Sequence, residues 1–198
     1  MENYLFKVLM GGCVGHKRTE IMTKFTSGKT NSDTRVIIGV DFAVHCIDLP
    51  ENKGSAGLQI WDFGEEHRFR SLLPCFCQGA AGAILFFDLA KPETLYELEE
   101  WIRLIKSNTD NIPIMLCGAN HHLLGNPGDI SRTFEWIQDF VQVHQLSGFR
   151  SISVETEYNI TESFEQLTAL MVHYQKFPNS PVSHSPTLAE LLQGISSL

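Results

Sequence analysis

The sequence lacks any long apolar run, and this limits the cellular locations that we expect for the protein. No stretch approaches the roughly 18 apolar residues that a membrane-spanning helix needs, and residues 1–4 do not form a signal peptide. Residue 2 is Glu and residues 195–198 contain no cysteine, so the motifs for myristoylation and prenylation are missing. We therefore expect a cytoplasmic protein without a lipid anchor or transmembrane segment.

Basic charge is also scarce. The 198 residues include 15 Lys and Arg against 23 Asp and Glu, which gives a formal net charge of −8. A nucleic acid or an anionic membrane requires a basic surface. Neither is expected as the main partner.

Cysteine and histidine are present, but not in a metal-binding pattern. The 5 cysteines lie mostly inside apolar runs, as free thiols in a reducing compartment do. Cys75 and Cys77 have no second pair at zinc spacing. His121 and His122 are adjacent on a predicted loop, where neighbouring side chains rarely converge on one ion. No metal site is expected.

Apolar runs and helical spacing alternate along the chain. The runs at 5–10, 36–46, 58–61, 83–87, 112–117 and 151–154 predict six strands. Helical periods lie between and after them, at 19–25, 95–105 and 164–174. This alternation predicts an α/β fold with a six-stranded, mostly parallel, doubly wound sheet. The turn at 50–54 predicts a hairpin, and hence one antiparallel edge strand.

The sequence changes character after this alternating region. Residues 177–186 are rich in Pro and Ser without apolar periodicity, which predicts a linker. Residues 187–190 then offer a capping box. An apolar stripe with the spacing i, i+3, i+4, i+7 follows: Leu188, Leu191, Leu192 and Ile195. We expect a domain at 1–176, the linker, and a short amphipathic helix at 187–198 that docks either on its own domain or on a partner.

The stretch 12–19 joins the first apolar run to the first helical period. A strand that ends in glycine and turns into a helix is the architecture of a phosphate-binding loop, whose pattern is G-x-x-x-x-G-K-[ST]. Gly12 and Thr19 keep the outer positions, with Gly15 inside the loop. Lys17 replaces the second Gly of the pattern and Arg18 replaces its Lys.

With this loop and strand order, residues 38–42 (Ile-Gly-Val-Asp-Phe) and 58–62 (Leu-Gln-Ile-Trp-Asp) make the chain resemble the Ras superfamily of small GTPases. The Rab-like branch is most similar, over roughly residues 4–176. The resemblance implies the P-loop small-GTPase fold. It also implies a site for GTP and Mg²⁺, in which the loop Lys binds phosphate and the next hydroxyl holds the metal.

The resemblance also shows that the nucleotide motifs are altered. Thr19 and Asp62 retain groups that serve Mg²⁺ in the family. Four other positions are substituted: Ile37 for the first-switch Thr, Glu65 for the Gly that meets the γ-phosphate, Glu66 for the water-orienting Gln, and His122 for the Asp that reads guanine. Shifting the register to place Asn120 on the family Asn puts Leu123 at the Asp position. The family S-A-K motif reads as residues 153–155, with Glu155 in place of Lys.

These substitutions favour a pseudo-GTPase that acts as a protein-interaction module, with no bound cofactor and no enzymatic activity. The alternative is an atypical GTP-binding switch with weak GTP hydrolysis, in which Arg18 replaces the Lys and Thr19 holds Mg²⁺ with GTP or GDP. A third hypothesis is an anion or acidic peptide bound by His16, Lys17 and Arg18.

The residues of one protein-binding surface of the family are retained in this sequence. Phe42, Trp61 and Phe76 align with the aromatic triad through which Rab-like proteins present their switch face to effectors, which implies a protein partner. Alternatively, all three are ordinary core aromatics. Two features are expected to fix this face without nucleotide: Lys17 and Arg18 pair with Glu65 or Glu66, and Ile37 packs into the vacated metal position.

Overall fold

The fold is known from a computed structural model, which describes residues 2–14, 17–27, 35–37, 40–50, 53–63, 73–120 and 127–177. For 35–37 and 127–131 it describes the backbone alone. Of the predicted features, the linker beyond residue 177 and the helix at 187–198 lie outside the described residues.

The described strands form one sheet in the order β2-β3-β4-β1-β5-β6-β7. They are β1 (Glu2–Gly12), β2 (Arg35–Ile37), β3 (Val40–Leu49), β4 (Gly54–Phe63), β5 (Ala80–Asp88), β6 (Ile114–Ala119) and β7 (Gly148–Ser151). Central β1 pairs in parallel with β4 and β5, and β3 is antiparallel to β4. The predicted α/β class, mostly parallel sheet and hairpin are confirmed.

The sheet differs from the prediction in three details. In the described part of the chain the sheet is 7-stranded, because the apolar run at 36–46 divides into β2 and β3, which pair antiparallel to each other. The antiparallel strand β3 is consequently not at the edge, which β2 occupies. An apolar run alone does not show where the chain reverses. Likewise, the run at 151–154 predicts a strand, but β7 ends at Ser151 and Ile152 and Val154 are buried outside it.

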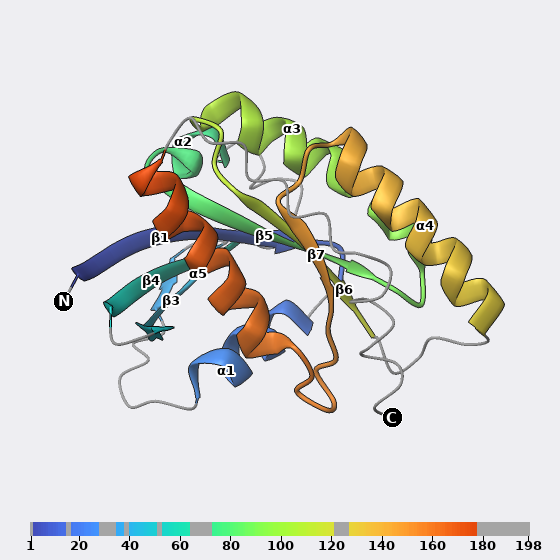
Figure 1. Ribbon diagram of the computed structural model, residues 1–198, viewed down its shortest axis with the longest axis horizontal. Coiled ribbons are helices and arrows are strands. Elements are labelled where there is room, and N and C mark those ends of the chain that lie inside the picture. The colour runs from blue at the N-terminus through green and yellow to red at the C-terminus, as the bar shows by residue number, and fades with distance from the viewer. Residues whose placement is uncertain are drawn as a thin grey trace.

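Helices cover both faces of the sheet (Figure 1). They are α1 (Lys17–Thr26), α2 (Leu73–Cys77), the 3₁₀ helix η3 (Pro92–Leu95), α3 (Leu98–Asn108), α4 (Pro127–Val143) and α5 (Ile160–Lys176). The predicted periods at 19–25, 95–105 and 164–174 fall on α1, on η3 with α3, and on α5. No helix in the described part of the chain is long and apolar enough to cross a membrane.

The core has two halves, one on each face of the sheet. Val8 and Met10 of β1 pack with α1 and α5 on one face, whereas Leu9 packs with α3 and α4 on the other. A central parallel strand is buried on both faces in this way. The parallel strands consequently end together at one edge of the sheet, where the loops that follow them meet.

Candidate functional site

β1 ends with a glycine, Gly12, that the packing requires. Gly12 has φ +119°, and a Cβ there would lie 2.1 Å from the carbonyl oxygen of Phe86 in β5. Only glycine adopts this conformation at such a close approach without strain. The next residue, Cys13, donates its N–H to the same oxygen at 2.8 Å. Gly12 is therefore needed to bring the loop against β5.

Arg18, in the first turn of α1, turns inward. Its Nε donates to Oδ1 of Asp62, near the end of β4, at 2.9 Å. Its Nη1 donates to the carbonyl oxygen of Gly12. The side chains of Arg18 and Asp62 are only 6% and 4% exposed. The cation at the position of the phosphate-binding Lys is thus already bonded to two acceptors of its own chain.

The burial of this pair makes it hard to open. A charge left in a buried setting without its partner costs about 3–5 kcal/mol. Asp62 is the penultimate residue of β4, and Arg18 is the second residue of α1. The ion pair therefore fastens the start of α1 to the end of β4.

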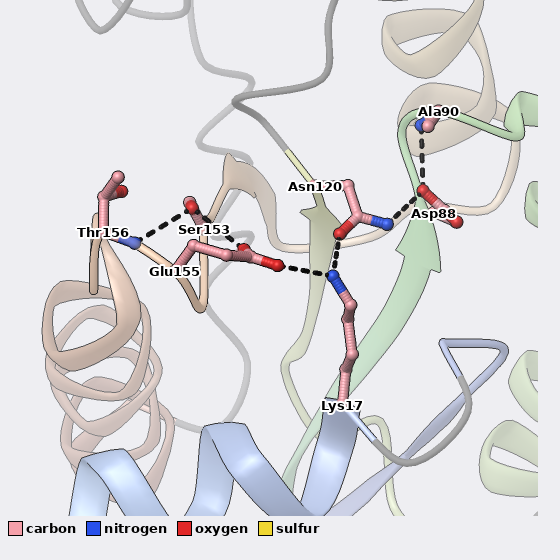
Figure 2. A network of polar contacts seen from close by, with 7 residues as sticks. All are labelled: Lys17, Asp88, Ala90, Asn120, Ser153, Glu155 and Thr156. Carbon is pink, nitrogen blue, oxygen red and sulfur yellow. Dashed lines mark hydrogen bonds and ion pairs between the residues drawn. The ribbon is translucent and has the colours of Figure 1, made fainter.

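Lys17 points the other way and joins a second network (Figure 2). Its Nζ donates to Oε1 of Glu155 at 2.8 Å and to Oδ1 of Asn120. Asn120 directly follows β6, and Glu155 lies in the loop after β7. One ammonium group consequently links three loops at the carboxyl edge of the sheet.

The outer members of this network are also paired. Asn120 donates its Nδ2 to Oδ1 of Asp88 at 2.6 Å, and that oxygen accepts the Ala90 N–H at 2.9 Å. On the other side, the Ser153 hydroxyl donates to Oε2 of Glu155 at 3.3 Å. Asn120 is 6% exposed and holds a left-handed backbone with φ +64°. Both ends of its amide are used, so the network fixes Asn120 in place.

The comparisons with known proteins agree with this architecture. The model of the Ras family matches residues 7–173. The chain belongs to the Ras family. It is similar to the Ras-related protein Rab-11A of Dictyostelium discoideum, with 27% identity over 191 residues that cover 94% of this chain and 85% of that protein.

The sequence resemblance predicts a motif for each member of the two networks. It assigns Arg18 to the phosphate loop and Asp62 to the second switch motif. It assigns Asn120 and Glu155 to the two segments that read guanine in the family. Under these assignments, the contacts of Lys17 run from the phosphate loop to both of those segments.

The structure brings together only some of the predicted residues. Arg18, Gly12 and Asp62 meet directly, whereas Thr19 is exposed on α1. Lys17 and Arg18 form ion pairs with Glu155 and Asp62, whereas their predicted pairing with Glu65 or Glu66 falls on residues outside the described part of the chain. Five predicted positions lie outside the described residues, namely Gly15, His16, Glu65, Glu66 and His122, and of Ile37 only the backbone is described.

The sequence carried one signal for the missed contact between Lys17 and Glu155. A cation appears where the Ras-family loop has Gly, and a carboxylate appears where the family motif has Lys. These two changes of charge are complementary. The role of Asn120 and Asp88 had no comparable signal, because it depends on how β5 and β6 end side by side.

The aromatic triad forms a continuous cluster. The Trp61 ring lies 5.3 Å from Phe42 and 5.6 Å from Phe76, centroid to centroid, and all three residues are half-buried. Neither of the two expectations describes them fully, since they are neither fully exposed nor ordinary core. Among the residues that the structure describes, the buried Trp61 Nε1 finds no hydrogen-bond acceptor.

Lys7 lies over the Trp61 ring of this cluster. Its Nζ lies 4.6 Å from the centroid of the Trp61 ring and donates to the Gln78 carbonyl at 3.0 Å. Burial lowers the pKa of Lys7 and raises that of nearby Cys77.

In the described residues no three His, Cys, Asp or Glu side chains are grouped to hold a metal ion.

Proposed function

We propose that this Ras-family chain is a pseudo-GTPase whose own basic side chains take the place of the nucleotide, and that it acts as a protein-interaction module. The observation that carries the proposal is the buried Arg18, bonded to Asp62 and to the Gly12 carbonyl. A family member that binds GTP needs a free cation at this position for the terminal phosphates.

The energies favour the internal pair over GTP. Parting Arg18 from Asp62 costs about 3–5 kcal/mol, which corresponds to about two to three and a half decades of affinity. The resemblance places Glu65 beside the γ-phosphate, which adds a second cost to GTP binding. A carboxylate about 5 Å from a phosphate charge costs on the order of 3 kcal/mol at an effective dielectric near 20. Together these terms remove the affinity that a small GTPase needs.

The residues present do not fit a nucleotide with Mg²⁺. Asp62 is neutralised by Arg18, so it is a poor acceptor for the water shell of a metal ion. Lys17 joins the phosphate loop to the base-reading segments, a link that bound nucleotide would otherwise provide. We therefore expect no resident cofactor and no GTP hydrolysis.

The binding surface in this proposal is the cluster of Phe42, Trp61 and Phe76. Its half-buried rings offer apolar area and aromatic edges, as protein interfaces do. The net charge of −8 supports a protein partner rather than a nucleic acid. We place this interaction in the cytoplasm.

One observation favours a second function, an atypical GTP-binding switch. Thr19 keeps a hydroxyl at the metal-binding position and is exposed on α1. For Thr19 to act there with Mg²⁺, Arg18 would have to leave Asp62 for the phosphates.

The nucleotide content of the purified protein separates the two functions. The protein is heat-denatured and the supernatant is chromatographed for guanine nucleotide, with a sample spiked with one equivalent of GDP as the recovery control. We expect no GDP or GTP above the blank. Stoichiometric nucleotide would overturn the pseudo-GTPase proposal in favour of the switch.

A further inference from the structure

A concave site lies at the opposite end of the sheet from Lys17 and Arg18. It is a cavity of about 550 Å³ at the amino ends of β1 and β5. Its walls include the loop between α3 and β6 and the last turn of α5. This volume falls in the range of sites that bury a small ligand or a few side chains.

The apolar part of this cavity is left uncovered by the domain. Leu5 lines it and is 69% exposed, although it belongs to the central strand β1. Side chains of central strands in a doubly wound sheet are normally covered by a helix. The β5 residues that line the cavity are small, namely Ala80 and Ala81.

The chain leaves the described domain at the rim of this cavity. Tyr174 and Gln175, in the last turn of α5, line it. Lys176 then holds Glu2 at the start of β1, with 2.6 Å between Nζ and Oε2. Figure 1 shows the end of α5 and the start of β1 toward the same side of the molecule.

The sequence after residue 177 contains apolar side chains that match the apolar part of the cavity. The linker 177–186 spans at most roughly 35 Å when extended, which is ample for a return to the cavity. The apolar stripe of Leu188, Leu191, Leu192 and Ile195 then offers side chains of the size that the cavity accepts. A short tether holds such a segment at an effective concentration of about millimolar, so weak contacts suffice.

We propose that segment 187–198 docks in cis, with its leucine stripe in the cavity lined by Leu5 and Tyr174. A helix of this length is marginal alone, so docking and helix formation occur together. This inference does not rest on the pseudo-GTPase proposal, because the cavity lies at the other end of the sheet and its test uses no nucleotide.

Hydrogen–deuterium exchange on the full chain tests the docking. We expect the amides of 188–195 to exchange at least tenfold more slowly than in a synthetic 187–198 peptide. In a chain that stops at Phe177, the amides of 109–112, which line the cavity, should exchange faster. Tail amides that exchange at the peptide rate in the full chain would overturn the proposal.

Three variants and a dilution series sharpen this test. Leu192→Asp and Leu5→Asp should each return the tail to the peptide rate, whereas Gln193→Asp, which adds the same charge off the stripe, should keep the protection. Leu5 is already exposed, so its substitution leaves the domain folded, which the melting temperature checks. Protection that falls on dilution, together with sedimentation as a dimer, would show a second copy as the occupant and overturn docking in cis.

Discussion

Arg18 donates its Nε to Oδ1 of Asp62 at 2.9 Å, and the two side chains are 6% and 4% exposed. The contact joins residues 44 positions apart, at the start of α1 and the end of β4. It pairs two side chains that the sequence resemblance assigns to the nucleotide site.

A double-mutant cycle measures this pair. Arg18→Met or Asp62→Leu alone should lower the free energy of unfolding by about 3–5 kcal/mol, because each leaves a buried charge unpaired. The double variant should lose much less than the sum of the two. Urea denaturation provides the values, and a loss below 1 kcal/mol for both single variants would show that the pair is not what holds these elements together.

Lys17→Met should lower the free energy of unfolding by about 1–2 kcal/mol. It leaves the carbonyl oxygen of the buried Asn120 without the ammonium that donates to it. The matched control is Lys24→Met, which breaks the exposed ion pair to Glu157 (2.7 Å) and should cost less than 1 kcal/mol. Equal losses for the two variants would argue against a special role of the Lys17 network.

Cys117 should make the folded protein less stable in alkali. Burial raises the pKa of its thiol to about 12 from an ordinary 9.0, so above pH 9 the unfolded chain releases a proton that the folded chain retains. Stability therefore falls as the pH rises from 9 toward 12, by up to about 1.4 kcal/mol per pH unit. Cys117→Ala should remove this part of the slope in urea titrations at pH 9–10.5, and identical slopes would contradict it.

The proposed partner surface predicts an affinity for the protein partner that does not depend on GTP or GDP. Trp61→Ala should weaken binding to an isolated partner at least tenfold, since a central aromatic residue carries much of the energy of an interface. Tyr96→Ala, which truncates an aromatic residue that is 57% exposed outside the cluster, is the control and should bind as the wild type does. A tenfold change of affinity on adding GTP and Mg²⁺ would mean that the face is still switched by nucleotide.

Most of the fold could be predicted because buried strands and one-sided helices leave periodic patterns. α4 is not among the predicted helices, although its buried Phe134, Ile137 and Val141 recur at helical spacing. Aromatic and β-branched residues lower helix propensity, and Pro127 and Gly128 interrupt the start of the pattern. The division of the run at 36–46 into two strands likewise left no mark in the apolar pattern.

The candidate site was predictable as a position but not as a set of contacts. Because parallel strands end at one edge, the sequence placed Lys17 and Arg18 near the acidic residues of other loops. The choice among those acids depends on tertiary geometry, since the Lys17 contact to Glu155 spans 138 positions. A pattern of charges indicates that pairs form, but not which ones.

The most direct test of the central claim is a calorimetric titration of the purified protein with GTP in the presence of Mg²⁺. If Arg18 and Lys17 occupy the nucleotide site, no saturable heat appears up to about 1 mM GTP, and His122→Asp, which repairs only the base-reading position, behaves in the same way. A stoichiometric isotherm with a micromolar or tighter Kd for the wild type would contradict the account.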